Sequence, residues 1–282
     1  MTAGKPGAHR PLLLLTGLAC VLIAAGAYGR TDAPLVIEPD WRIDWRTATQ
    51  PGNAATSADA AVQLTNGKRV QEQQLDRTVA RHQGPDRWLP YHFSVGGAPV
   101  TTVAPGTDRH HHFVNHFLEG FVPMPKAEPW VPLYVIAHRK TYVEDPQQYG
   151  VREMWQTSRE SMGNPRGDCE DHAIALADWL IGLGKDARVV LGTMNGGGHA
   201  WVVVRENDQT WLLEATRKRR TRHWSYPLAS LHPEYVPREM FDRVRWWQNT
   251  GGATVDYTGA HWQLGARFER PENRAATAPT GS

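Results

Sequence analysis

Apolar side chains recur at helical spacing over residues 173–183, directly after a short polar stretch. The spacing predicts a helix with Asp168 at its N-cap position and Cys169 in its first turn. The face that carries Cys169 is otherwise apolar, with Ala173, Leu176, Ala177 and Leu180. We therefore expect the thiol to face the body of the domain, while Asp171 and Asp178 lie off that face.

Beyond this helix the pattern changes to that of strands. A β-branched run predicts a strand at 187–194, and a Gly-rich stretch predicts a turn at 195–198. Alternating side chains predict two more strands, at 199–205 and 210–216. The chain in this region is therefore expected to run helix, strand, strand, strand.

The pairing of the last two strands decides whether His199 and Glu214 can meet. A two-residue loop at 207–208 predicts that the numbers of paired residues sum to an odd number, which places Trp201 opposite Glu214. His199 is then a diagonal neighbour of Glu214 on the same face, about 7–8 Å away and within side-chain reach. An even sum would place Glu214 on the opposite face.

The remaining segments have less regular patterns. We expect a helix over 60–82, irregular or β structure over 85–108, and helices in parts of 142–161. The aromatic segment 234–247 is expected to pack back onto the core, and the chain from residue 267 onward to be disordered.

These patterns divide the chain into four segments. They are a signal peptide or membrane anchor at 1–28, an N-terminal extension with linker and helix at 29–125, a domain at 126–250 that contains Cys169, His199 and Glu214, and a partly disordered C-terminal tail at 251–282. The leader has a basic start, an apolar run at 12–23 and small residues at 25–27 that fit a cleavage site.

Two alternatives to cleavage of the leader stay open. An uncleaved anchor is one, although the apolar run is slightly short of the about 17–25 residues of a spanning helix. A lipoprotein attached through Cys20 is the other, although the residues before it match the usual pattern poorly. Each alternative predicts a periplasmic or extracytoplasmic protein, either secreted or associated with the inner membrane.

Composition and charge limit the kinds of partner that we expect the protein to bind. With 282 residues, 40% of them hydrophobic, the chain can bury one good core, and its net charge of +2 favours no particular partner. The basic run at 217–223 lacks the wider pattern of nucleic-acid binding, so we expect no nucleic-acid partner. We interpret this run as solvated surface; a basic rim that attracts an anionic substrate, cell-wall polymer or lipid headgroups is the alternative.

Cysteine usage makes Cys169 a candidate nucleophile. Once a leader containing Cys20 is removed, Cys169 is the only thiol, so the mature protein cannot form an internal disulfide. Such a thiol is either inert and buried or reactive. The unpaired N–H groups and the dipole at a helix N-terminus favour the thiolate, so we expect Cys169 to ionise readily.

The histidine run at 110–112 is followed by His116, four residues beyond His112. On a helix, His112 and His116 would share a face and could hold a metal ion. However, no Glu lies between them in the metalloprotease pattern and no third ligand is evident. We therefore predict no metal and no cofactor, and interpret these residues as surface and core histidines.

Three motifs together resemble the transglutaminase-like superfamily, in particular its bacterial cysteine proteinase type. They are Gly-Asp-Cys-Glu-Asp at 167–171, Gly-His-Ala-Trp at 198–201 and Trp-Leu-Leu-Glu-Ala-Thr at 211–216. The resemblance covers roughly residues 130–220. It implies an α+β fold with a papain-like or transglutaminase-like core, in which the Cys-bearing helix packs on an antiparallel sheet.

The resemblance also implies a catalytic triad. Cys169 would attack the substrate, His199 would be its base, and Glu214 would orient His199. The acid in the superfamily is commonly Asp in a Leu-Asp-Pro-Thr-like ending, so Glu214 and Ala215 depart from the pattern.

Supporting residues are expected upstream of the nucleophile. Either Trp155 or Gln156 resembles the residue that assists the oxyanion hole in such folds, together with the backbone N–H of Cys169. Asp168 is expected to support the site from the helix N-cap.

The resulting hypothesis is an exported cysteine peptidase that cleaves a peptide or amide bond of a protein or cell-wall peptide through an acyl-enzyme. A protein-glutamine transamidase would use the same triad, and an N-acetyltransferase-like enzyme would use the same arrangement with a cofactor. The alternative from another class is a catalytically idle binding domain, against which the intact Cys169 and His199 argue.

Overall fold

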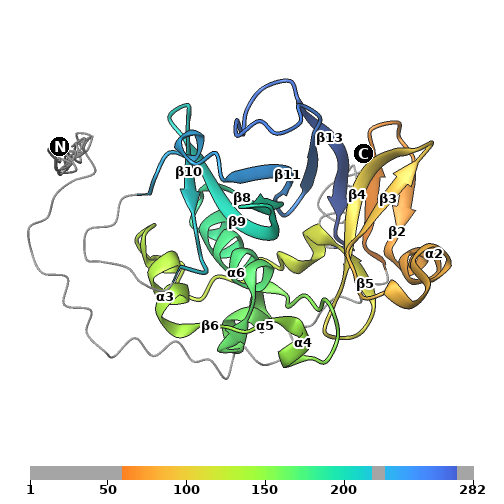
Figure 1. Ribbon diagram of the computed structural model, residues 1–282, viewed down its shortest axis with the longest axis horizontal. Coiled ribbons are helices and arrows are strands. Elements are labelled where there is room, and N and C mark those ends of the chain that lie inside the picture. Colours follow the sequence, from red (N-terminus) through yellow and green to blue (C-terminus); the bar gives the residue numbers. More distant parts are fainter. Residues whose placement is uncertain (1–58, 218–225, 272–282) are drawn as a thin grey trace, which may run out of the picture. The chain divides into compact units, whose positions relative to one another are not determined.

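An eight-stranded sheet, with every pair antiparallel, forms the centre of the fold (Figure 1). The computed structural model describes residues 59–217 and 226–271. The strand order is β10-β9-β8-β11-β12-β13-β1-β2. The strands are β1 Ala61–Leu64, β2 Arg69–Gln71, β8 Asp186–Met194, β9 Gly197–Glu206, β10 Gln209–Leu213, β11 Tyr235–Phe241, β12 Arg245–Asn249 and β13 Trp262–Glu269.

Two smaller sheets and several helices surround the main sheet. One sheet contains β3 Tyr91–Val95, β4 Ala98–Pro105 and β5 His111–Phe113, and the other pairs β6 Thr141–Tyr142 with β7 Arg166–Gly167. The α-helices are α2 Leu75–Gln83, α3 Val131–Arg139, α4 Asp145–Gln148, α5 Ser158–Gly163 and α6 Cys169–Gly182. Short 3-10 helices are η2 Glu72–Gln74, η3 Gly84–Asp86, η4 Val114–Phe117 and η5 Ala229–Leu231.

Helix α6 packs against β8 and β9 and begins at the predicted residue. Every side chain from 170 to 180 is buried. The buried surface of the helix is therefore wider than the single apolar face that the pattern predicts. Asp171 and Asp178 therefore lie in the interior. Asp178 is held there by the backbone N–H groups of Gly120 and Phe121, at 2.8 and 2.9 Å, and by Nε of Arg243 at 2.5 Å.

Both turns of the β8-β9-β10 meander consist of two residues with positive φ. Asn195 and Gly196 have φ of 50° and 83°, and Asn207 and Asp208 have 52° and 58°. This is the type I′ geometry, whose twist matches that of the flanking strands. Paired residues of β9 and β10 sum to an odd number, which confirms the predicted register.

The α+β fold class is confirmed, with the Cys-bearing helix on an antiparallel sheet. The first turn is shorter than the predicted 195–198, because Gly197 and Gly198 already pair in β9. The third strand ends at Leu213 rather than 216. The segment 234–247 packs on the core as expected, as β11 and part of β12.

The helix predicted over 60–82 is wrong for its first half. Residues 61–71 form the hairpin of β1 and β2, which turns at Gly67 with φ of 82°, and the helix α2 starts only at Leu75. Val62 and Leu64 are buried because β1 pairs with β13, a contact from the far end of the chain. Tertiary pairing thus overrides the local pattern.

The main sheet crosses the segment boundaries expected near 125 and 250. Strands β1 and β2 come from the N-terminal segment, and β13 comes from the tail. The predicted disorder from residue 267 onward is wrong for residues 267–269, because these residues belong to β13. The leader at 1–28 and most of the basic run lie outside the described residues, and within the described residues no helix is long and apolar enough to span a membrane.

Gly192 provides a test of the packing between β8, β9 and β11. A Cβ at this position would lie 2.2 Å from the carbonyl oxygen of Val236 and 2.8 Å from Cη2 of Trp201. Gly192→Ala should therefore lower the free energy of unfolding by about 1–3 kcal/mol through overpacking. Gly198→Ala is the control, because a Cβ there has no atom within 4 Å. Urea unfolding that gives equal stability for the two variants would contradict this packing.

Candidate active site

Cys169 is the first residue of α6, and its thiol lies against strand β9. The thiol is partly buried, and its Sγ contacts Oε2 of Glu170 at 3.3 Å. The backbone N–H of Ala200 hydrogen-bonds to the sulfur. Ala200 directly follows His199, the candidate base, in β9. Asp168 occupies the N-cap position, but its side chain makes no capping hydrogen bond.

His199 and Glu214 lie on the same face and are hydrogen-bonded. Nε2 of His199 is 2.8 Å from Oε2 of Glu214, and both side chains are 8% exposed. The antiparallel register makes this contact possible, since it directs both side chains to one side of the β9-β10 hairpin. With Nε2 bound to Glu214, Nδ1 is the ring nitrogen that can exchange a proton with a substrate or a thiol.

The carboxylate of Glu214 is held by more than His199. Its Oε1 accepts from the backbone N–H and the hydroxyl of Thr216 at 2.8 and 2.7 Å, and its Oε2 accepts from the Tyr235 hydroxyl at 2.9 Å. Burial alone would raise the pKa of Glu214, but the bonds from His199 and Thr216 outweigh it and lower the pKa. The carboxylate therefore stays charged beside His199.

Two aromatic rings pack against the imidazole of His199. The ring of His199 stacks on Trp201 with centroids 6.1 Å apart, and the ring of Tyr235 lies at the same distance. Trp201 is fully buried and donates its indole N–H to the Tyr257 hydroxyl at 3.1 Å. These contacts restrict the imidazole to one orientation, as a proton-transfer group requires.

Trp155 and Gln156 are both buried, and their side-chain N–H groups donate to residues other than Cys169. The Trp155 indole N–H donates to Glu153 at 2.8 Å, and the Gln156 carboxamide donates to the Arg166 carbonyl at 3.0 Å. The backbone N–H of Gln156 also donates to Asp171 at 2.7 Å. Gln156 thus braces the segment before the nucleophile.

Four buried carboxylates lie beside the nucleophile, a feature that the sequence analysis missed. One oxygen from each of Asp145, Asp168, Glu170 and Asp171 lies within 4.8 Å of the others. Each of the four also has a buried oxygen without a hydrogen-bond partner among the described residues. The sequence places Asp168, Glu170 and Asp171 beside Cys169, but the position of Asp145, from α4, could not be inferred from local pattern.

One cation lies near these carboxylates. Lys140 is buried, donates to the carbonyls of Ser161 and Asn164 at 2.6 and 2.9 Å, and interacts electrostatically with Asp171 and Asp168. A single ammonium does not balance four carboxylates. Burial, together with repulsion from Asp168, raises the pKa of Asp145, Glu170 and Asp171. Oxygen-only ligands of this kind suit a hard divalent cation such as Ca²⁺.

The readily formed thiolate predicted for Cys169 does not agree with this environment. Burial and then the charge of Asp168 raise the pKa of the thiol to about 12, although hydrogen bonds from Ala200 and to Glu170 act in the opposite direction. The helix N-terminus favours an anion, as expected, but the neighbouring acids outweigh it.

Residues 153–264 match the model of the CEP76 peptidase-like domain. This range includes Cys169, His199 and Glu214 and covers less than half of the chain. The chain is thus similar to a peptidase-like domain over the region of its candidate site.

Curated relatives match over a short segment. The centrosomal protein of 76 kDa from Mus musculus is 42% identical over 62 residues, which are 22% of this chain and 9% of that protein. The human protein of the same name is 44% identical over 55 residues, 19% of this chain and 8% of that protein. The chain therefore spans less than a tenth of the length of these relatives.

Among solved structures, an EGTA-treated form of Legionella pneumophila LapG is similar to this chain, with a TM-score of 0.37 and 15% sequence identity. The match covers 70% of this chain and 90% of that chain. A calcium-bound form of LapG has a TM-score of 0.36 and 16% identity over 52% of this chain and 82% of that chain. At these TM-scores the likeness assigns no role to any residue of this chain.

Asp168 provides a test of the thiol environment. Asp168→Asn removes a negative charge that raises the pKa of Cys169, so more thiolate should be present at neutral pH. We expect iodoacetamide to alkylate Cys169 faster in this variant than in the wild type. Asp186→Asn is a matched control, because Asp186 pairs with Arg188 at the other end of β8. An unchanged or slower rate in Asp168→Asn would contradict the electrostatic account.

Proposed function

We propose that this protein is an exported, transglutaminase-like cysteine hydrolase that cleaves an amide bond through an acyl-enzyme. Cys169 is the nucleophile, His199 the base, and Glu214 the carboxylate that orients His199. The 2.8 Å bond between His199 and Glu214, on the strand that contacts the thiol, carries this proposal. The match of residues 153–264 to a peptidase-like domain supports it.

The proposed reaction has two steps. In the first, His199 takes the thiol proton, the sulfur attacks the amide carbonyl, and the C–N bond breaks as His199 protonates the leaving amine. In the second, His199 takes a proton from water, which attacks the thioester and releases a carboxylic acid and the free thiol. Glu214 keeps one tautomer of His199 and stabilises the imidazolium in both steps.

The oxyanion of each step requires donors. The backbone N–H of Cys169 is the proposed first donor, because the first N–H groups of a helix have no partner inside the helix. A second donor from Trp155 or Gln156 remains part of the proposal. It requires a donor orientation other than the bonds to Glu153 and Arg166.

The proposed substrate is a protein or a cell-wall peptide outside the cytoplasm. The N-terminal leader supports export, and an uncleaved leader would attach the protein to the inner membrane. The same triad would serve a transamidase, in which a primary amine replaces water in the second step. Mass spectrometry of the products with and without an added primary amine separates the two reactions: an amine-bearing product would overturn hydrolysis.

Variants of the triad test the assignment of roles. Cys169→Ala should abolish cleavage of a protein substrate such as casein while the fold is retained. Glu214→Gln should lower kcat by about 10²-fold or more, because an amide holds the ring without supplying charge. Glu214→Asp should be milder, because it keeps the charge at a slightly shorter reach. If neither Glu214 variant loses more than a few-fold, another group orients His199 and this role is wrong.

We further propose that Asp145, Asp168, Glu170 and Asp171 hold a divalent cation, with Ca²⁺ the best match to carboxylate ligands. The observation that favours it is the set of buried oxygens without hydrogen bonds, one from each residue. A bound cation would also offset the negative field at Cys169.

Thermal unfolding tests the cation. Calcium should raise the Tm of the chelator-treated protein, because binding to the folded state alone stabilises it. Asp145→Asn should reduce this shift, and Asp186→Asn, outside the cluster, should keep it. A Tm that calcium leaves unchanged, or an equal shift in both variants, would contradict a cation at this cluster.

A further inference from the structure

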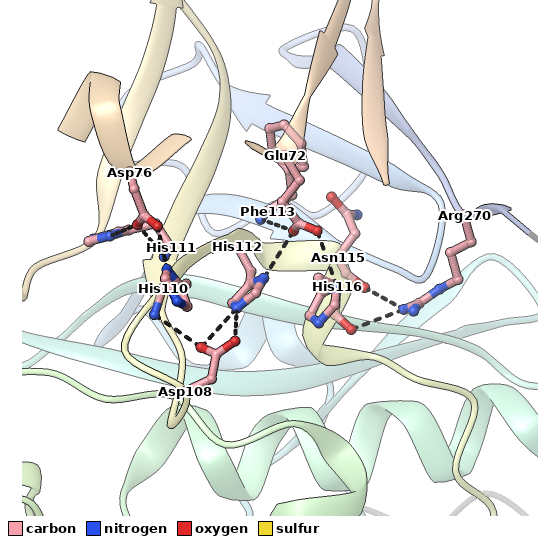
Figure 2. Close-up of polar contacts among 10 residues, drawn as sticks. All are labelled: Glu72, Asp76, Asp108, His110, His111, His112, Phe113, Asn115, His116 and Arg270. Atoms are coloured by element: carbon pink, nitrogen blue, oxygen red, sulfur yellow. Dashed lines mark hydrogen bonds and ion pairs between the residues drawn. The ribbon is translucent and has the colours of Figure 1, made fainter. Parts of the chain in front are cut away.

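A second group of potential metal ligands lies outside the candidate active site. It joins three side chains from three elements: Glu72 at the start of η2, His112 in β5 and His116 in η4. One ligand atom from each lies within 4.8 Å of the other two. Figure 2 shows the carboxylate of Glu72 between the two imidazoles. The sequence offered no third ligand because Glu72 lies far earlier in the chain, and the fold brings it in.

The spacing of these atoms fits one small ion. Nδ1 of His112 is 3.3 Å from Oε1 of Glu72, and Nδ1 of His116 is 3.6 Å from Oε2 of Glu72. Two ligands bound at about 2.0–2.1 Å to a tetrahedral ion are themselves roughly 3.3 Å apart. Both histidines thus present the same ring atom to the same carboxylate at nearly the separation that a shared ion requires.

Two of these atoms are buried and have no hydrogen bond of standard geometry. Glu72 and His112 are each 5% exposed, and neither Oε2 of Glu72 nor Nδ1 of His112 has a hydrogen bond of standard geometry among the described residues, although Nδ1 forms an ion pair with Oε1 of Glu72. Buried polar atoms left in this state are costly, and a bound ion is one of the few physical reasons for them. They lie on the side where the three ligands converge (Figure 2).

The surroundings already orient two of the ligands. Nε2 of His112 lies 3.0 Å from each carboxylate oxygen of Asp108. Burial alone would lower the pKa of His112, but the bonds to Asp108 and Glu72 raise it to about 10, so a metal ion would displace the proton on Nδ1. Oε1 of Glu72 accepts from the backbone N–H of Phe113 at 3.1 Å. A carboxylate that binds the far nitrogen of a histidine is the usual outer partner of a metal-binding imidazole.

We propose that Glu72, His112 and His116 bind a transition-metal dication, for which Zn²⁺ has the preferred ligand set of two imidazoles and one carboxylate. Asp108 binds the other ring nitrogen of His112, Nε2, and so orients this ligand. The rings of His112 and His116 stack at 17° with centroids 4.4 Å apart, so binding tilts the ring of His116 until the two lone pairs converge. The side chain of His116 is 16% exposed, which leaves it freer to move than the other two.

The bound ion would connect segments on either side of α2. Glu72 directly follows the β1-β2 hairpin, which lies at the edge of the main sheet. The two histidines lie in β5 and η4, between the β3-β4-β5 sheet and α3. The ion therefore clamps the N-terminal hairpin to the rest of the described fold. This role is independent of Cys169 chemistry and goes beyond the proposed hydrolase function.

The experiment uses the full chain after chelation, with Zn²⁺ as the probe. We expect calorimetry to give one Zn²⁺ per chain, and a Tm about 5–10 °C higher at about a hundredfold excess over Kd. Co²⁺ in place of Zn²⁺ should give a tetrahedral visible spectrum. Glu72→Gln and His116→Gln should weaken binding at least tenfold, and Asp108→Asn by roughly 10–100-fold.

His110→Gln is the matched control. His110 belongs to the same histidine run, is 66% exposed and contacts Asp76 at 2.6 Å rather than the proposed ligands. The variant should bind Zn²⁺ as the wild type does. Circular dichroism checks that each variant is folded, and His116→Gln, at the most exposed ligand, decides if Glu72→Gln does not fold. Absence of stoichiometric binding, or binding that His116→Gln leaves unchanged, would overturn the proposal.

Discussion

Burial of helix α6 against β8 and β9 is the constraint on which the candidate site depends. The helix has no exposed side from 170 to 180, so its position relative to the sheet is set by packing along its whole length. Asp178 adds directional contacts, because it accepts from two backbone N–H groups and from Arg243. With the helix held in this way, the thiol of its first residue, Cys169, accepts a hydrogen bond from the backbone N–H of Ala200 on β9.

The sheet contributes the second half of the site through register alone. The type I′ turn at 207–208 sets the pairing of β9 with β10, and this pairing directs His199 and Glu214 to one face. The site therefore combines a rigid helix end with a rigid hairpin. The acids beside Cys169 oppose formation of the thiolate, because they raise the pKa of the thiol. A cation at those acids would reconcile the two.

The parts of the fold that could be predicted from the sequence are those with local causes. Helix α6 follows from its apolar spacing, and the β8-β9-β10 meander follows from alternation and turn residues. The hairpin at 61–71 was missed because β1 is fixed by β13, from the other end of the chain. Asp145 and Glu72 were missed for the same reason, since no sequence period reports which distant carboxylate a fold brings to a cluster.

The central claim is that Cys169, His199 and Glu214 act as one unit in acyl transfer. Its most direct test is covalent: the protein is mixed with 4-nitrophenyl acetate, quenched in acid and digested, and the acetylated peptide is identified by mass spectrometry. The account predicts one acetyl group on Cys169 in the wild type. It also predicts acetylation slower by tenfold or more in both His199→Gln and Glu214→Gln, with the double variant no slower than the worse single variant. Acetylation of Cys169 at the same rate in all of them would contradict it.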